Sequence, residues 1–266
     1  MSTFFADIEA FAAAIPDGAK LAIPPDYSGV AVAATRALVR RNIRGLHLIA
    51  VPQAGLQADV LIGAGCVATL EAAGINLGEH GLAPRFTAAV LAGSIVMRDA
   101  TCPAIHAGLQ AAEKGIPFLP LRGILGSDLL RVRPDWRVID NPFGLNDPIV
   151  LIPAIRPDIA LFHARLADRD GNVWIGVRRE LMLMAHASAK TFVTVETVQT
   201  DNLLADPALA AGTIPALYID AIQHAPGGMR PLGFEDETAH HAALANYANL
   251  AQTEAGFRDW LRTWLA

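Results

Sequence analysis

The segment from Pro117 to Leu130 carries the side chains of this chain that are best suited to hold a small ligand. An apolar run, Pro117–Leu121, is followed directly by Arg122 and then by Gly126 and Ser127. An apolar run that glycine ends abruptly is typical of a buried strand followed by a loop. In open α/β sheets, small ligands bind at the loops that follow the carboxyl ends of strands. Because a guanidinium can hold a carboxylate through two hydrogen bonds, the sequence predicts a carboxylate-binding loop here.

A second glycine-containing segment allows two interpretations. Gly63, Gly65 and Ala68 satisfy the loose dinucleotide pattern G-x-G-x-x-A, after an apolar run, Val60–Ile62, that predicts a short strand. That pattern also needs a second strand that ends in Asp or Glu about 20 residues later, and residues 74–80 do not have that character. A tight strand-to-helix turn that packs closely is therefore favoured over nicotinamide binding.

The histidines and hydroxyl residues provide no anchor for several common chemistries. The chain has 8 histidines, but no H-E-x-x-H motif, and His240 and His241 would point to different sides of a helix. His163 lies in an apolar context that is typical of a core position. No G-x-S-x-G elbow and no G-x-x-x-x-G-K-[ST] phosphate loop occurs. The pattern thus predicts no metal site, no esterase triad and no nucleotide-phosphate loop.

The elements that must position these residues alternate along the chain between strands and helices, which predicts a mostly parallel sheet covered on both faces. The predicted strands cover residues 20–23, 46–51, 60–62, 94–97, 117–121, 149–151, 159–163 and 191–195. The predicted helices cover residues 3–15, 30–41, 86–92, 104–114, 179–189 and 254–265. The last of these has Phe257, Trp260 and Trp264 on one face, and packing on the chain's own core is favoured over a contact between subunits. Asp170-Gly171-Asn172 predicts a turn between two strands.

Composition excludes several classes of protein. The 266 residues are 53% hydrophobic and only 18% charged, so the chain can bury a large core and also a large interface with a partner. The formal net charge is −5 and no basic run occurs, which argues against a nucleic-acid partner. Cys66 and Cys102 form no CxxC pair, and no apolar segment has the length of a membrane span or the character of a signal peptide. These features favour a cytoplasmic protein without a membrane partner.

Several segments resemble, in the same order, the A-type subunit of the family I CoA-transferases of the glutaconate CoA-transferase type. The resembling segments are Ile15–Ala19 (IPDGA), Asp59–Val67 (D-x-LIGAG-x-V), Gly78–Phe86, Leu109–Gly123 (LQAA followed by PFLP-x-RG), Pro153–Ala160, Asp168–Val173, Val193–Glu196 and Ala225–Gly228 (APGG). Each piece alone is weak, but so many pieces in one order are specific, and they extend over nearly the whole chain. The resemblance implies one domain, residues 1–266, with an open, mostly parallel sheet flanked by helices, the NagB/RpiA/CoA-transferase-like fold.

The resemblance also implies a function. A chain of this type is one half of a heteromeric enzyme, in an A2B2 assembly, that moves CoA between an acyl-CoA and a carboxylic acid. The thioester is attacked by a glutamate of the other, B-type subunit, so no catalytic residue is expected here, and Glu196 is interpreted as a structural or interface carboxylate. The CoA thioester is a substrate, and no permanently bound cofactor or metal is expected. The residues expected to shape the substrate site are Ser28, Gly29, Gln53, Gly63, Gly65, Arg122, Gly126 and Ser127.

One departure from the resembled pattern leaves the activity open. The first predicted strand ends in Pro24-Pro25 where the family has a Gly-Gly pair, and proline has no N–H to donate to a ligand. An acyl-CoA hydrolase on the same heteromeric scaffold, acting on a ring or a thioester, is therefore an alternative. A non-catalytic ligand-sensing or stabilising subunit is another. A neighbouring gene for the B-type subunit favours the enzyme, whereas a fused DNA-binding domain would favour the sensor. The sequence does not define the acyl group or the acceptor.

Overall fold

The computed structural model describes residues 2–234 and 240–266, and its centre is a ten-stranded sheet. Its strands are β1 (Thr3–Phe5), β2 (Lys20–Ile23), β3 (Leu46–Ala50), β4 (Val67–Ala72), β5 (Val96–Asp99), β9 (Ile159–Asp168), β10 (Val173–Trp174), β11 (Lys190–Gln199), β12 (Thr213–Ile214) and β13 (Ala221–His224). Eight of them run parallel in the order β1-β13-β11-β9-β2-β3-β4-β5, and the short β10 and β12 add antiparallel pairs beside β9. The predicted α/β class with an open, mostly parallel sheet is confirmed.

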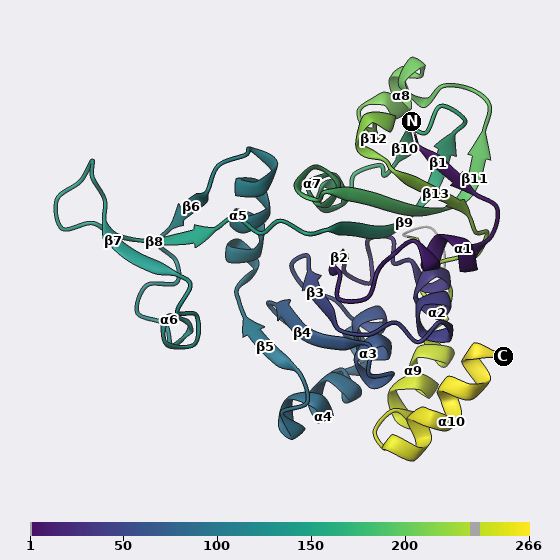
Figure 1. The fold of residues 1–266 in the computed structure, drawn as a ribbon, viewed down its shortest axis with the longest axis horizontal. Coiled ribbons are helices and arrows are strands. Elements are labelled where there is room, and N and C mark those ends of the chain that lie inside the picture. Colours follow the sequence, from purple (N-terminus) through teal and green to yellow (C-terminus); the bar gives the residue numbers. More distant parts are fainter. Residues whose placement is uncertain (1, 235–239) are drawn as a thin grey trace.

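Helices cover both faces of this sheet (Figure 1). They are α1 (Ile8–Ala13), α2 (Val32–Arg40), α3 (Leu56–Gly63), α4 (Pro84–Ala92), α5 (Cys102–Glu113), α7 (Arg179–Ala187), α8 (Pro207–Ala210), α9 (His241–Leu250) and α10 (Glu254–Leu265), with short 3₁₀ turns η1 (Gly78–His80), η2 (Leu203–Ala205) and η3 (Ala216–Tyr218). Helices α1 to α4, α9 and α10 lie on one face, and α5 and α7 lie on the other.

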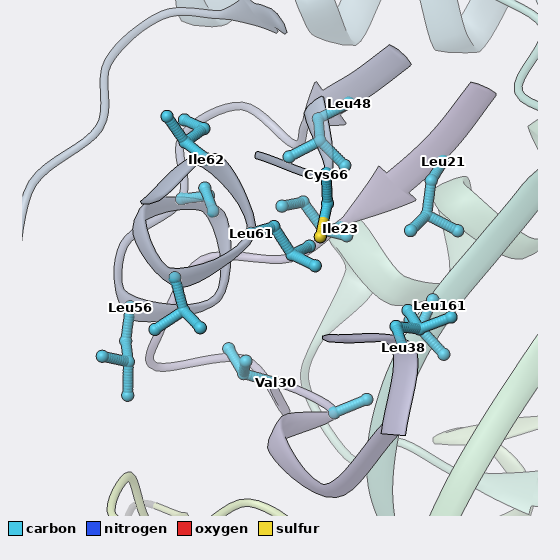
Figure 2. Close-up of a cluster of buried hydrophobic side chains, with 14 of the residues drawn as sticks. Leu21, Ile23, Val30, Leu38, Leu48, Leu56, Leu61, Ile62, Cys66 and Leu161 are labelled. Atoms are coloured by element: carbon cyan, nitrogen blue, oxygen red, sulfur yellow. The ribbon is translucent and has the colours of Figure 1, made fainter. Parts of the chain in front are cut away.

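Alternate residues of the central strands enter two separate cores. In β9, Ile159 and Leu161 pack with α2, whereas Ala160 and Phe162 pack with α5 and α7. Figure 2 shows the first of these cores, where Leu21, Ile23 and Leu161 meet side chains of α2 and α3. Such two-sided burial explains why the central strands are apolar runs rather than alternating patterns.

A three-stranded antiparallel sheet forms an arm that projects from the main body (Figure 1). It consists of β6 (Phe118–Leu121), β7 (Arg137–Asp140) and β8 (Pro148–Pro153), with the short helix α6 (Leu129–Val132) before β7. An ion pair of 2.7 Å between the buried side chains of Arg133 and Glu71 joins the arm to β4. The hairpin between β7 and β8 exposes Phe143 and Leu145 almost completely.

Several predicted elements need correction. The segment 3–15 is a strand followed by a short helix, because the Asp7 side chain caps α1 by accepting from the Ala10 N–H at 2.7 Å. The predicted strand 60–62 is wrong, since these residues lie inside α3, where almost every side chain is buried. The segment 117–121 is a strand, but it is half exposed and belongs to the arm instead of the parallel sheet.

Two local predictions are confirmed closely. Helix α10 spans Glu254–Leu265 as predicted, with Phe257 buried and Trp260 and Trp264 packed against the core. The Asp170–Asn172 turn joins β9 to the antiparallel β10. Within the described ranges, no helix is long and apolar enough to cross a bilayer.

Candidate active site

A cavity of about 160 Å³ lies beyond the carboxyl end of β2, where the longer strand β9 continues past it. It is lined by Tyr27, Ser28, His163, Ala164, Arg165, Trp174, Ile175, Gly176, Val177, Arg178, Leu181 and Phe234. Its position matches the general rule that ligands of open α/β sheets bind outside strand carboxyl ends. Pockets for drug-sized ligands have volumes of at least about 300 Å³, so this space suits a small group or one end of a larger ligand.

Gly29 fixes the loop between β2 and α2 against β9. Its carbonyl accepts a hydrogen bond of 2.7 Å from the His163 N–H, and its φ is +88°. A Cβ on Gly29 would lie 2.1 Å from the carbonyl oxygen of His163. Both the left-handed backbone and the close approach therefore require glycine. The residue before it, Ser28, is thereby held on the wall of the cavity.

A buried histidine links the cavity to Glu196. The register of β9 and β11 puts Thr194 beside His163, and Glu196 lies two residues further on the same face. The fully buried His163 hydrogen-bonds Thr194 Oγ1 through Nδ1 and Glu196 Oε1 through Nε2, each at 2.8 Å. Burial alone would raise the pKa of Glu196, but hydrogen bonds from His163 and the Gly227 N–H and the charge of Arg230 hold that pKa below its usual value. Glu196 is thus an ionised partner of His163.

The Gly227-Gly228 pair completes this arrangement. The Gly227 N–H donates to Glu196 Oε2 at 2.6 Å, so both carboxylate oxygens of Glu196 are engaged. A Cβ on Gly228 would lie 2.8 Å from Cε1 of His163, which makes glycine necessary at this contact. Phe234 stacks on the imidazole of His163, with ring centroids 5.6 Å apart.

Polar and charged side chains line the cavity or contact its lining near α7. The nearly inaccessible Ser28 donates its hydroxyl to Glu180 Oε1 in the first turn of α7. The guanidinium of Arg178 lies over the ring of Tyr27 at 5.2 Å from its centroid, and that of Arg165 lies over Phe234 at 4.3 Å. The walls therefore combine aromatic surface with charged side chains of both signs.

The Pro24-Pro25 segment leads to a carboxyl group with unusual acidity. Both oxygens of Asp26 accept from the Leu56 N–H at the start of α3, at 3.0 and 3.1 Å. Burial raises the pKa of Asp26 from 3.8 to about 7, the Leu56 N–H opposes this rise, and the nearby Asp59 adds to it. Asp26 is thus a carboxyl group that changes charge near neutral pH, two residues before Ser28.

The free energy of unfolding is expected to depend on pH because the pKa of Asp26 is raised in the folded chain. Because the folded pKa of Asp26 is raised, its contribution to stability is complete below about pH 4 and is lost as the pH rises to about 7. At 1.36 kcal/mol per pH unit the loss cannot exceed about 4 kcal/mol, and residual solvent contact reduces it to about 2 kcal/mol. Urea unfolding of Asp26→Asn between pH 4 and 8 should lack this decline. The exposed control Asp201→Asn should retain it, and a decline that persists in Asp26→Asn would contradict the assignment.

The predicted site residues do not all come together. Ser28 lies on the cavity wall, Gly29 lies directly behind it, and Gln53 lies in the β3–α3 loop outside the cavity. Gly63 ends α3 and Gly65 precedes β4, so both lie at the amino end of the parallel strands, opposite to Ser28. A Cβ on Gly63 would lie 2.6 Å from the ring of Phe257, which explains the glycine by close packing with α10. The tight-turn interpretation agrees with this geometry, except that a helix precedes the turn and a strand follows it.

Arg122, Gly126 and Ser127 lie in the arm. Arg122 holds Asp147 in a two-bond fork, Nε to Oδ1 at 2.8 Å and Nη2 to Oδ2 at 2.5 Å. The hydrogen bonds from Arg122 and Asn141 lower the pKa of Asp147 to about 2. The Ser127 hydroxyl donates to the Ile124 carbonyl at 2.7 Å. In this chain the carboxylate that fills the Arg122 fork is therefore its own.

Two matched variants, each assayed in the active enzyme, separate the two possible roles of Arg122. If the fork only orders the β7–β8 hairpin, Arg122→Lys and Asp147→Asn should change activity and proteolysis of residues 141–147 to the same small extent. This is the outcome we expect. A loss of about 100-fold in kcat/KM in Arg122→Lys alone, with Asp147→Asn unaffected, would instead show that Arg122 binds a substrate carboxylate.

His163 and the role of Gly227 were not predicted from the sequence. The apolar neighbours of His163 are typical of a core histidine, and its partners come from β11 and from the loop after β13. The one signal in the sequence was that two of the resembling segments, Val193–Glu196 and Ala225–Gly228, contain the residues that contact His163. These two segments lie side by side because β11 pairs with β13, and no local sequence pattern reveals that pairing.

Comparison with known proteins gives the class. Residues 6–225 match the family model described as Coenzyme A transferase, and the chain belongs to this family. It is 32% identical over 225 residues to the A-type subunit of 3-oxoadipate CoA-transferase from Pseudomonas knackmussii, which covers 82% of this chain and 77% of the relative. Over 245 residues it is 29% identical to the cholesterol ring-cleaving hydrolase IpdA subunit of Rhodococcus jostii, covering 88% and 82%. The chain spans 51% of the length of an uncharacterized protein of Archaeoglobus fulgidus that is 30% identical.

Solved structures agree on the fold. Glutaconate coenzyme A-transferase from Acidaminococcus fermentans superimposes with a TM-score of 0.88 at 26% identity, covering 99% of this chain and 89% of that one. A variant of the decarboxylase AibA/AibB superimposes with a TM-score of 0.84 at 31% identity, covering 100% and 99%. The predicted resemblance to the A-type subunit of the CoA-transferases and the predicted fold are thus confirmed.

Proposed function

We propose that this chain is the A-type subunit of a heteromeric enzyme that moves CoA between an acyl-CoA and a carboxylic acid, with the cavity beside Ser28 and His163 receiving the acyl group. The observation that carries the proposal is the engagement of Glu196. Both of its oxygens hold structural hydrogen bonds, to His163 and to the Gly227 N–H. The carboxylate nearest to the cavity's histidine is therefore used for positioning, which agrees with a nucleophile supplied by the B-type subunit.

The chemistry follows from a carboxylate nucleophile of that kind. The glutamate of the B-type subunit first attacks the thioester carbonyl carbon and the C–S bond breaks. The products of this step are an acyl–glutamyl mixed anhydride and the CoA thiolate. The thiolate then attacks the glutamyl carbonyl, which releases the first carboxylic acid and leaves a glutamyl-CoA thioester. The carboxylate of the second acid attacks this thioester, the C–S bond breaks again, and a second mixed anhydride forms. The thiolate then attacks the acyl carbonyl of that anhydride, which gives the new acyl-CoA and releases the glutamate carboxylate. This chain's part is to bind and orient the acyl group.

The partner and the location are part of the same proposal. Exposed apolar side chains on the arm, Phe143 and Leu145 at the hairpin and Val138 and Ile139 in β7, provide surface for the B-type subunit. We infer an A2B2 assembly, a CoA thioester as substrate with no permanently bound cofactor, and a cytoplasmic location consistent with two cysteines that form no disulfide.

An acyl-CoA hydrolase is the second candidate, favoured by the Pro24–Asp26 segment. The loop offers no N–H at Pro24 or Pro25, and it carries Asp26, a carboxyl group with a pKa of about 7, two residues before Ser28 in the sequence. A group of that acidity can accept a proton from water at neutral pH. Water would then replace the acceptor acid in the same complex.

One set of assays on the complex distinguishes these functions. A panel of short acyl-CoA donors is incubated with and without an isotope-labelled acid, and labelled acyl-CoA, free CoA thiol and CO2 are measured together. Transfer of label to CoA, faster than thiol release without acceptor, is the expected result. Thiol release without acceptor would establish a hydrolase, and CO2 release a decarboxylase. Acyl-CoA binding without any turnover would indicate a sensing or stabilising subunit, and each of these results would overturn the transferase.

A further inference from the structure

A cluster of metal-ligating side chains lies away from the candidate active site. It consists of Glu79 and His80 in η1, after β4, and His241 at the start of α9. One ligand atom from each side chain lies within 4.8 Å of the others. Across residues 2–234 and 240–266, this is the one set of three His, Cys, Asp or Glu side chains that meets this geometry.

The separations suit a shared ion. Nδ1 of His241 contacts Oε1 of Glu79, and Nε2 of His80 lies 3.7 Å from the same oxygen. Ligand atoms bound tetrahedrally at about 2.0–2.1 Å from zinc lie about 3.3 Å apart. Small rotations of exposed or partly exposed side chains are therefore enough to bring the three atoms onto one ion.

His80 has an unsatisfied ring nitrogen. Its side chain is only 16% exposed, and its Nε2 is buried without a hydrogen-bond partner among the described residues. A buried polar atom without a partner costs free energy that a bound ion would recover. This orphaned nitrogen points independently to a ligand at the cluster.

The loop that carries two of the ligands is fixed by its own backbone. Gly78 and Gly81 have φ of +61° and +86° on either side of the turn. The Leu77 N–H donates to the Gly81 carbonyl at 2.8 Å, and the Gly78 N–H donates to Asn76 Oδ1 at 3.0 Å. The backbone that carries Glu79 and His80 is thus ordered before an ion binds, which lowers the entropic cost of binding.

We propose that Glu79, His80 and His241 bind one divalent transition-metal ion of the zinc class. Two imidazoles and one carboxylate form a donor set that zinc uses, with water in the fourth position, whereas magnesium and calcium prefer oxygen ligands alone. The ion cross-links the loop after β4 to α9, a helix that Tyr247 already joins to Asp59 of α3 through a hydrogen bond of 2.6 Å. This proposal does not depend on the transferase function.

The test uses the full chain, freed of any tag and treated with a chelator, and zinc chloride in competition with a chromophoric chelator. The expected result is one equivalent of zinc bound at micromolar affinity or tighter. Cobalt chloride should give the visible absorption of a four- or five-coordinate centre. His241→Gln, at an exposed position, should weaken zinc binding at least about 10-fold and abolish the rise in Tm that zinc causes in the unaltered chain.

Two matched controls locate the ion. His240→Gln changes the neighbouring histidine outside the cluster, and Cys102→Ser removes the exposed thiol. Both variants should bind zinc within about twofold of the unaltered chain. The proposal is overturned if no stoichiometric zinc binds, if His241→Gln binds as the unaltered chain does, or if either control loses the ion.

Discussion

Purified without the B-type subunit, the chain is expected to transfer CoA at the uncatalysed rate, and the complex at least about 1,000-fold faster. The reason is that the Glu196 carboxylate is held by His163 and the Gly227 N–H and so positions the histidine instead of attacking the thioester. The measurement is the appearance of labelled acyl-CoA with the chain alone, with the isolated B-type partner, and with the two together.

Glu196→Gln provides the control for this result. If Glu196 acts by positioning, the complex of the variant should keep measurable activity with a raised KM. Robust transfer by the isolated chain, abolished in Glu196→Gln, would instead make Glu196 the nucleophile.

Gly29→Ala is expected to be the most damaging single substitution at the cavity. Its Cβ would lie 2.1 Å from the His163 carbonyl oxygen, at a φ of +88° that an L residue rarely adopts. Strain of this kind and overpacking each cost about 1–3 kcal/mol. We therefore expect the free energy of unfolding to fall by about 3 kcal/mol and kcat/KM of the complex to fall at least about 100-fold.

Gly18→Ala is the matched comparison for that variant. Gly18 also has a left-handed φ, +75°, but a Cβ there would meet nothing within 4 Å. It should therefore lose only about 1 kcal/mol of stability and no activity. Equal effects of the two substitutions in urea unfolding and in kinetics would show that backbone conformation alone, and not contact with His163, makes Gly29 necessary.

The sequence predicted the parallel sheet and most of its helices because two-sided burial produces clear apolar runs separated by turn residues. It failed at Val60–Ile62, where a short apolar run inside a helix buried on all sides has no periodicity that distinguishes it from a strand. For Pro117–Leu121 the strand was predicted correctly, but a local pattern does not specify its partner, which is β8 of the arm. Because the partner of this strand was not known, Arg122 was expected to lie beside Ser28, whereas in the structure it lies in the arm.

The candidate site was predictable only in part. Ser28 and Gly29 lie in the loop that follows β2, so sequence order alone placed them at the carboxyl end of that strand. His163 lies at the same cavity because the backbone of Gly29 is hydrogen-bonded to β9. Its partners Thr194 and Glu196 are set by the register in which β11 pairs with β9. The metal-ligating cluster depends in the same way on α9 packing beside η1, far apart in the sequence. Such contacts come from tertiary packing, which no spacing rule contains.

The most direct test of the central claim is the intact mass of both proteins of the complex after it meets an acyl-CoA without acceptor. We predict that the B-type subunit gains the mass of a glutamyl-bound CoA, which borohydride removes by reducing the thioester, while this chain keeps its own mass. The same adduct on this chain, at Glu196 or elsewhere, would contradict the assignment of acyl binding to this chain and of nucleophilic attack to its partner.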